Sequence, residues 1–441
     1  MTNILPTTKW ARGSIAGTAT LKIGGKHLKH IAKRPFLSVT KQREDKQRLE
    51  DETAELIFKT FTQLRGTALK IAQMLSMETA FLPESFRKEL SKSYYQVPPL
   101  GRALARKLML QEFGKPPEEL FTHFNPQAFA AASLGQVHSA HDEYGNELAV
   151  KLQYPGINTT IDNDLQLVRS LVKRTRHAEL LLSALDEIGQ RLREEVNHEQ
   201  EANNTEWFRQ HLNLPNVIIP PVYRNLSAKR ILTTGRLNGV HLEQWLQLNP
   251  SQESRNHFAQ LMHDVFVQSF YGLQALHADP NPGNYLFTDD ETLGLLDFGC
   301  VRYFSQKFVT LLPELLRAYM DHNADTVIGT YEKLGMVAEM SPNELQAFFN
   351  STLQPFGDWL TKPFKVEAFD FGDRDSPYTS EGWKLMGQLS DMKKINHVAK
   401  SLKTTNKMAN EFVFFNRTFF GLYQIFERMS ATVRMQHQWM L

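Results

Sequence analysis

Hydrophobic positions recur near the helical period over residues 47–76. The apolar side chains on this repeat are Leu49, Leu56, Ile57, Phe61, Leu64, Leu69 and Ala72. The pattern is typical of an amphipathic helix. Pro98 and Pro99 end it, because proline has no amide hydrogen to donate within a helix. The chain up to about Gln96 is therefore predicted to be mostly helical.

The strand-like pattern lies in residues 100–236. Residues 135–156 read as strand, turn, strand, with residues 142–146 as the loop and Gly145-Asn146 as its turn. A strand period of two places Ala149, Lys151 and Gln153 on one face of the second strand. Leu148, Val150 and Leu152 take the other face. One long helical segment is expected over residues 180–212, and extended character over residues 216–239.

The remainder of the chain is expected to be rich in helices. Residues 257–277 place a broad apolar stripe on one helix, which predicts a central core helix. Its members are Phe258, Leu261, Met262, Val265, Phe266, Leu273 and Leu276. From about Ser305 the pattern is helical to the end, apart from a loop over residues 371–382.

Composition narrows the class of protein. The chain has 441 residues, of which 41% are apolar, enough for one large core or two ordinary ones. A net charge of +2, from 50 basic and 48 acidic residues, argues against a nucleic-acid partner. The single cysteine, Cys300, excludes an internal disulfide and indicates a reducing compartment, so a cytoplasmic location is expected. The sequence contains no run of about 18 apolar residues, so no membrane-spanning segment is predicted.

The first 43 residues carry a local positive charge. They contain nine Lys or Arg and no Asp or Glu, which indicates an anionic partner. Leu21, Ile23, Leu28 and Ile31 stand among lysines, a basic amphipathic pattern that suits anionic lipid at a membrane surface. Gly24-Gly25 weakens a helix, so a solvated basic arm is the alternative. A mitochondrial transit peptide is a further alternative, whereas the features of a secretory signal are missing.

Residues 277–299 carry the strongest chemical signal. Two short apolar runs, residues 285–287 and 293–296, flank a polar stretch and predict a β-hairpin. Asn284 and Asp297 then meet at its open end, where an amide oxygen and a carboxylate suit Mg²⁺. Asp279 enters on the preceding loop. This order is that of the catalytic half of a kinase-like site, and the alternative is a polar surface turn beside a chance D-F-G.

A kinase-like site also needs a phosphate-binding lysine on a strand. Lys151 fits, with the small Ala149 beside it leaving room for a flat ring. An edge-strand lysine that points to water is the alternative. An acidic partner for the lysine is expected on a neighbouring helix. The spacing does not choose among Glu194, Glu195, Glu199 and Glu201.

With these residues assembled, residues 49–302 resemble the UbiB family, the AarF-like atypical protein-kinase-like ATPases tied to isoprenoid quinone biosynthesis. Six segments carry the likeness: "RGTALKIAQMLS", which looks like the family's K-x-G-Q motif, "EEVNHEQEANN", which matches its E-x-D helix, "AAASLGQVHSA", "AVKLQYPG", "HADPNPGN" and "LDFG". The resemblance implies an α+β, bilobed protein-kinase-like fold, with a helical N-terminal extension over the active site and a helix-rich C-lobe. The implied domains are residues 1–43, 44–99, 100–236 and 237–441.

The resemblance also implies roles for single residues. Catalytic roles fall to Asp279, Lys70 and Gln73, and metal ligation to Asn284 and Asp297. The implied nucleotide-binding residues are Ala130, Ala131, Ala132, Ser133, Ala149, Lys151, Glu195 and Glu201. The implied cofactors are ATP or ADP with Mg²⁺. The implied partners are anionic or quinone-related lipid and quinone-biosynthesis enzymes.

The chain departs from the family pattern at four positions. Ala72 replaces the glycine of K-x-G-Q, and Asn281 stands where histidine is usual. Asn197 replaces the aspartate of the E-x-D motif, so Glu195 is expected to hold Lys70 alone. Gly235 occupies a hinge position where many relatives have an acidic residue.

The alanines of residues 130–132 stand where a kinase has glycines over the nucleotide. Glycine takes positive φ at little cost and alanine does not. The loop is therefore expected to hold the terminal phosphate less freely and to favour binding or slow hydrolysis. Substitution of Ala131 or Ala132 by glycine is expected to change the preference between ADP and ATP. The alternative is that these alanines only pack under the sheet.

Three classes of function follow from the sequence. The first is a Mg²⁺-dependent kinase-like ATPase that supports ubiquinone or other lipid metabolism at a membrane surface. The second is a phosphotransferase acting on a small molecule. The third is a nucleotide-binding pseudokinase scaffold. If Lys70 and Gln73 fold over the site as the resemblance implies, a protein substrate could hardly enter, which argues against ordinary protein kinase activity.

Overall fold

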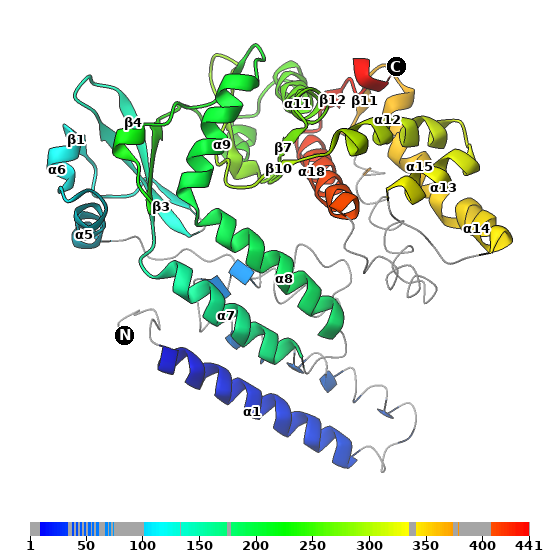
Figure 1. Cartoon of the computed structure of the whole chain (residues 1–441), viewed down its shortest axis with the longest axis horizontal. Coiled ribbons are helices and arrows are strands. Elements are labelled where there is room, and N and C mark those ends of the chain that lie inside the picture. Colours follow the sequence, from blue (N-terminus) through cyan, green and yellow to red (C-terminus); the bar gives the residue numbers. More distant parts are fainter. Residues whose placement is uncertain are drawn as a thin grey trace. The chain divides into compact units, whose positions relative to one another are not determined.

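The fold is seen in a computed structural model that describes residues 9–33, 101–132, 134–173, 178–334, 341–373 and 407–440, with Tyr378 and individual positions between 38 and 74. The chain divides into two compact units (Figure 1). The first comprises residues 1–200 and 223–235, and the second comprises residues 201–222 and 236–441. Both contain helices and small sheets, which confirms the α+β prediction.

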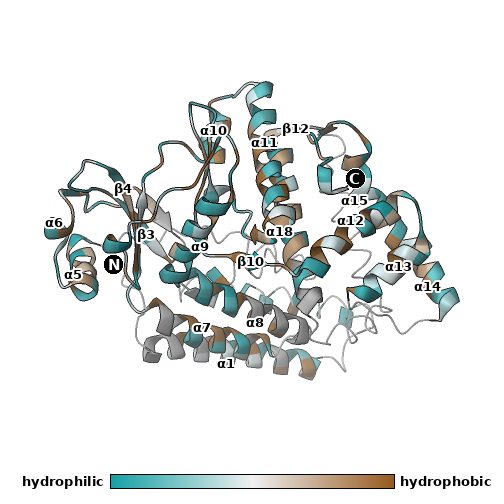
Figure 2. Ribbon diagram, turned by 45° about the horizontal axis from the view of Figure 1, so that its top comes forward, coloured by the Kyte–Doolittle hydropathy of each residue, from teal (hydrophilic) through white to brown (hydrophobic). Residues whose placement is uncertain are grey.

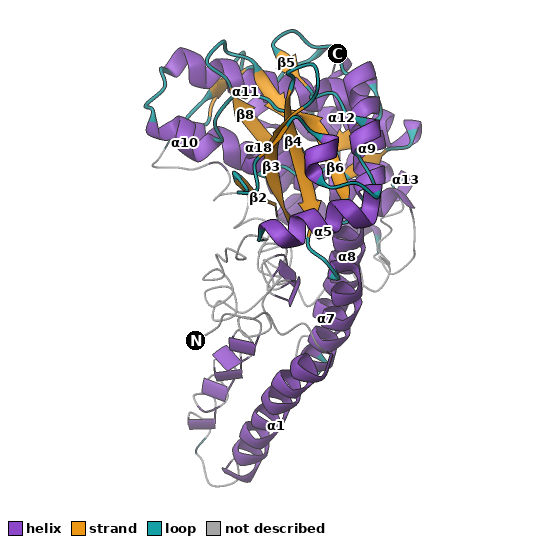
Figure 3. Ribbon diagram, turned by 90° about the vertical axis from the view of Figure 1, so that its left-hand side faces the viewer, coloured by secondary structure: helices purple, strands orange, loops and turns teal. Residues whose placement is uncertain are grey.

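The first unit contains a five-stranded antiparallel sheet (Figure 3). Its strands run in the order β1 (His123–Phe124), β3 (Gly135–His141), β4 (Glu147–Gln153) and β6 (Ile231–Gly235), with β2 (Ala130–Ala132) also paired to β3. The predicted β3–β4 hairpin is confirmed. Asp142 fixes its loop by accepting hydrogen bonds from the backbone N–H groups of Tyr144 and Asn146, and Gly145 takes φ +80°.

One face of β4 is fully buried, as its alternation predicts. Leu148, Val150 and Leu152 are 0% exposed and belong to one cluster with residues of α5 (Arg102–Phe113). The short helix α6 (Pro117–Leu120) precedes β1. Lys151 and Ala149 lie on the opposite, half-buried face. The sheet therefore separates an apolar core from the face that bears the lysine.

Three helices form a second core in the first unit. They are α1 (Lys9–Lys33), α7 (Ile157–Val172) and α8 (Ala178–Glu195), and they lie side by side in Figure 1. Ala19 and Ile23 of α1 are buried in a cluster with residues of α7 and α8. This burial explains why the basic segment is helical despite Gly24-Gly25. The described residues hold no helix long and apolar enough to cross a bilayer.

The single helix expected over residues 180–212 is two helices. After α8 ends at Glu195, α9 (His198–His211) begins anew. The side chain of Asn197 accepts a hydrogen bond from the backbone N–H of Gln200 at 3.1 Å, the geometry of an N-cap. The prediction of one helix was wrong because a side-chain cap leaves the apolar period unchanged.

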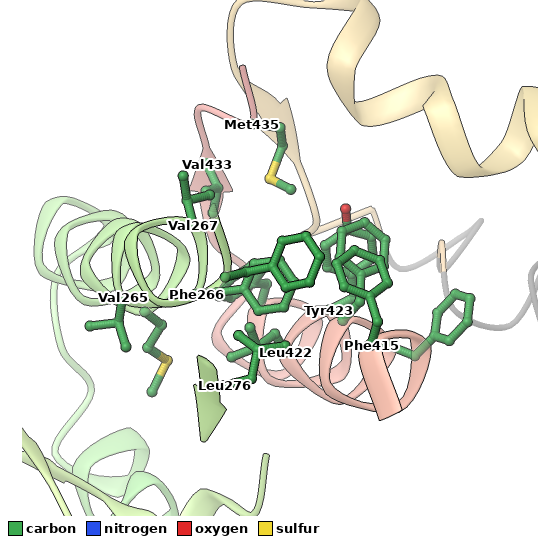
Figure 4. Close-up of a cluster of buried hydrophobic side chains, with 14 of the residues drawn as sticks. Val265, Phe266, Val267, Leu276, Phe415, Leu422, Tyr423, Val433 and Met435 are labelled. Carbon is green, nitrogen blue, oxygen red and sulfur yellow. The ribbon is translucent and has the colours of Figure 1, made fainter. Parts of the chain in front are cut away.

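The core of the second unit centres on two helices. α11 (Gln252–Val267) is buried along the predicted stripe, and α18 (Lys407–Met429) packs against it. Figure 4 shows side chains of both helices meeting, with the rings of Phe266 and Phe415 5.5 Å apart. In Figure 2 both helices carry mixed hydropathy. Leu276 is buried, but it lies on a strand, so the helix is shorter than expected.

The other elements of the second unit are mostly short. After α9 come β5 (Val217–Ile218), α10 (Leu242–Gln247), η3 (Gln268–Gly272), β7 (Ala275–His277), η4 (Pro282–Asn284), β8 (Tyr285–Phe287), β9 (Leu293–Leu295) and β10 (Val301–Tyr303). They continue with α12 (Gln306–Met320), α13 (Ala324–Lys333), α14 (Pro342–Phe348), η5 (Phe349–Leu353), α15 (Gln354–Thr361), η6 (Lys362–Lys365), β11 (Phe369–Asp370), β12 (Thr432–Val433) and η7 (Gln438–Met440). The first unit also has η2 (Arg224–Leu226). The antiparallel β11–β12 pair corrects the prediction of a helical chain end.

Candidate active site

The lysine strand lies inside its sheet. Lys151 on β4 stands between Val137 on β3 and Leu232 on β6, so the edge-strand alternative is wrong. Ala149 shares its face and lies opposite Thr234. Ladder pairing on both sides fixes the direction of the Lys151 side chain. Binding of a nucleotide by this face stays a prediction.

The alanine-rich segment is a strand where a loop was expected. Ala130 and Ala132 of β2 lie opposite Val137 and Gly135 of β3. Ser133 lies outside the described residues. A Cβ at Gly135 would lie 2.3 Å from the carbonyl oxygen of Leu152, so only glycine fits beside β4. Sequence reasoning did not single out Gly135, although a glycine within a strand pattern signals such a close approach.

The E-x-D segment is tied to the lysine strand. Gln153 at the end of β4 donates a hydrogen bond to the carbonyl oxygen of Val196 at 2.8 Å, in a buried position. The ammonium of Lys70 lies 3.5 Å from the carboxylate of Glu195. The expected contact of these two residues is thus present, while their catalytic role stays a prediction. Gln73 lies outside the described residues.

The predicted hairpin of the second unit is confirmed. β8 and β9 are antiparallel, with Tyr285 opposite Leu295. The backbone N–H of Leu296 donates to the carbonyl oxygen of Asn284 at 2.8 Å, so Asp297 follows directly at the open end. The buried amide nitrogen of Asn284 donates to Asp279 twice, to Oδ2 and to the carbonyl oxygen, each at 3.0 Å. One side chain therefore joins the loop aspartate to the hairpin.

Asp279 also affects a buried phenol. Burial raises the pKa of Tyr285, and the negative charge of Asp279 raises it further. Tyr285 is therefore a neutral hydroxyl at ordinary pH.

The D-F-G segment has an unusual backbone. Asp297 has φ +56°, in the left-handed region that few residues other than glycine adopt. Its carboxylate accepts a hydrogen bond from the N–H of Gly299 at 3.3 Å. Nε2 of His277 donates to the carbonyl oxygens of Leu296 and Asp297, at 3.0 and 2.8 Å. The histidine of "HADPNPGN" thus holds the backbone of the D-F-G segment.

Helix α9 supports the same segment from another direction. The buried side chain of Asn204 donates to the carbonyl oxygen of Phe298 at 2.8 Å. The rings of Phe208 and Phe298 are 5.0 Å apart. Glu201, a candidate nucleotide-binding residue, lies on this helix and is 3% exposed. Neither Asn204 nor His277 was singled out from sequence, because neither contact is local.

The donor atoms at the hairpin end fit Mg²⁺. Since the amide nitrogen of Asn284 bonds to Asp279, its oxygen is the atom that can bind a metal. The Asp297 carboxylate supplies a second oxygen. Among the described residues no group of three or more His, Cys, Asp or Glu could hold a metal ion. Two protein oxygens suit Mg²⁺, which keeps water and substrate phosphates as further ligands.

The chain is similar in sequence to a known family of kinase-like proteins. Residues 92–331 match the ABC1 atypical kinase-like domain. The chain is 30% identical over 329 residues to the uncharacterized protein slr0889 of Synechocystis sp., covering 71% of this chain and 81% of that protein. It is 27% identical over 381 residues to atypical kinase COQ8B, mitochondrial, of Danio rerio, covering 84% of this chain and 60% of that protein. The chain spans 44% to 61% of the length of three relatives including COQ8B.

A solved structure shares the fold. It is the complex of Rv3197 with erythromycin from Mycobacterium tuberculosis, with a TM-score of 0.57, 23% identity, and coverage of 89% of this chain and 96% of that one. The α+β fold predicted from the sequence is thus a kinase-like fold. By its matched domain, its relatives and its motifs, this chain belongs to the UbiB family of ABC1 atypical kinases.

Proposed function

We propose that the protein is a kinase-like ATPase that binds a Mg-nucleotide and supports isoprenoid quinone or other lipid metabolism at a membrane surface. The observation that carries the proposal is the position of Asn284, bonded to Asp279 on one side and adjacent to Asp297 on the other. Relatives named COQ8 and COQ8B, mitochondrial, support the link to coenzyme Q.

We assign different roles to Asn284, Asp279 and Asp297 of the second unit. Asn284 orients the Asp279 carboxylate so that it can accept a proton from the attacking hydroxyl or water. The oxygens of Asn284 and Asp297 would hold Mg²⁺, which neutralises charge on the nucleotide phosphates when bound. In the first unit, Lys151 and the Lys70–Glu195 pair are the groups we assign to the nucleotide.

The membrane part of the proposal rests on α1. Leu21, Leu28 and Ile31 are 78%, 69% and 64% exposed, while Lys22 and Lys29 are exposed on the same helix. Apolar side chains beside lysines suit a surface of anionic lipid. Sedimentation with anionic vesicles should fall when Leu21 and Leu28 are both changed to serine. Equal sedimentation would remove this part.

The first experiment measures Mg²⁺-dependent ATP hydrolysis with and without anionic liposomes, for wild type and Asp297→Asn. We expect turnover in the wild type, higher with liposomes, and a loss of about 100-fold in the variant. Equal turnover in the two proteins would refute the catalytic assignment. Mg²⁺-dependent nucleotide binding without turnover would favour a pseudokinase scaffold. A phosphorylated product in lipid extracts would favour a small-molecule phosphotransferase.

A further inference from the structure

Helix α18 lies outside the region that matches the family domain, yet it is central to the second unit. The match covers residues 92–331, and α18 spans Lys407–Met429. Phe415, Tyr423 and Phe426 are buried in the same cluster as the residues of α11. The helix is therefore held in a fixed position against α11 (Figure 4).

One face of α18 touches the loop that bears the catalytic aspartate. Nη2 of Arg417 lies 3.9 Å from Oδ1 of Asp279. Four residues later, a Cβ at Gly421 would lie 2.2 Å from Cγ of Pro280, the residue after Asp279. Residues four apart share a helix face. The absent side chain at Gly421 thus lets the helix backbone approach the loop, and this approach brings Arg417 to the carboxylate.

The same helix also contacts the segment that follows D-F-G. The buried carboxylate of Glu411 accepts hydrogen bonds from the N–H and the hydroxyl of Ser305, at 2.8 and 2.9 Å. The guanidinium of Arg302 lies over the ring of Phe414, 4.5 Å from its centre. Since α18 is fixed at both segments, Arg417 has a defined place relative to Asp279.

The contact between Arg417 and Asp279 restrains the carboxylate of the catalytic loop. The catalytic loop, residues 277–284, contains no Lys or Arg, and neither does the D-F-G segment, residues 296–301. The two oxygens of Asp279 have different neighbours, with Asn284 on Oδ2 and Arg417 facing Oδ1. A carboxylate restrained at both oxygens keeps one orientation, which matters because small misplacements of a catalytic group reduce rates strongly.

We propose that Arg417 is a positioning residue for the proposed phosphoryl-transfer reaction, acting by holding the Asp279 carboxylate against Asn284. The inference rests on the proposed function for its effect on turnover. Its effect on the loop does not depend on turnover. The two parts can therefore be tested in one set of proteins.

The experiment compares wild type with Arg417→Ala, Arg417→Lys and, as a matched control on the same helix, Arg428→Ala. Arg428 forms an ion pair with Glu243, a residue outside the catalytic loop. We expect kcat for ATP to fall about 10- to 100-fold in Arg417→Ala with little change in KM. Arg417→Lys and added guanidinium at tens of millimolar should restore part of kcat. Arg428→Ala should keep wild-type kcat.

Hydrogen exchange gives a readout that needs no turnover. The backbone N–H groups of Gly283 and Asn284 bond to Asn281. Exchange of residues 278–284 should accelerate in Arg417→Ala and not in Arg428→Ala. If the wild type lacks turnover, the proposed function fails and exchange alone decides the inference. Unchanged exchange, or a loss of kcat that neither lysine nor guanidinium repairs, would overturn it.

Discussion

The two units hold their candidate residues in different ways. In the first, Lys151 is positioned by regular pairing of β4 with strands on both sides. In the second, Asp279 and Asp297 lie on irregular backbone and depend on side chains: Asn284, His277 and Asn204. Backbone pairing is repeated along a strand, whereas each side-chain bond is single. Substitutions should therefore affect stability first in the sheet and activity first in the loops.

The largest effect on activity is expected for Asn284→Ala. The change removes the hydrogen bonds to Asp279 and one proposed metal ligand, so turnover should fall about 100-fold or more. Steady-state ATP hydrolysis measures the effect. Asn281→Ala, in the same loop but bonded only to its own turn among the bonds described, serves as the control and should lose less. Equal losses in the two variants would contradict the special role of Asn284.

Gly135→Ala tests the close approach of β3 and β4 in the sheet of the first unit. The new Cβ would meet the carbonyl oxygen of Leu152, a backbone atom that cannot move without disturbing β4. We expect a loss of about 1–3 kcal/mol in the free energy of unfolding, measured by urea denaturation. Gly101→Ala is the control, because a Cβ there meets nothing within 4 Å. If the two variants unfold alike, the close approach of β3 and β4 is not required.

Asn204→Ala should show both kinds of effect at a smaller size. It leaves the carbonyl oxygen of Phe298 without its buried donor, at a cost of about 1–2 kcal/mol. Turnover should also fall, since Asp297 precedes Phe298. Chemical denaturation and ATP hydrolysis are measured together, with the exposed neighbour Asn203→Ala as control. A stability loss at unchanged turnover would mean that α9 does not support the D-F-G segment.

The smallest effect concerns pH. Burial lowers the pKa of His437 from 6.5 to about 4, and the charge of His263 adds to the shift. The unfolded chain therefore binds a proton between about pH 4 and 6.5 that the folded chain does not, so stability rises with pH in this window, by at most about 1.4 kcal/mol per unit. His437→Phe should flatten that slope in melting curves at pH 5 and 7. If stability depends on pH equally in wild type and His437→Phe, the lowered pKa of His437 is refuted as the cause.

Local patterns carried much of the prediction. Gly145-Asn146 between two alternating runs gave the β3–β4 hairpin, and the polar stretch after Phe287 gave β8–β9. The hairpin alone brings Asn284 and Asp297 together. These features were predictable because a short polar turn joins the two strands of each hairpin.

The remaining features depend on distant partners. β7 pairs with β10 and β11 with β12, and in neither pair does a short turn join the two strands. Asn204 bonds to a residue 94 positions away. Arg417 reaches Asp279 from a segment for which the sequence predicted only helical structure. A periodicity describes which face is apolar, and it does not identify the segment that covers that face.

The cap at Asn197 has a consequence for how this family can vary. Asparagine and aspartate cap helices about equally well. An exchange between them at the third position of E-x-D therefore leaves the start of α9 in place. One substitution at residue 197 can therefore add or remove a negative charge two residues from Glu195 without a cost to the fold. Natural selection at this position then acts on the charge alone.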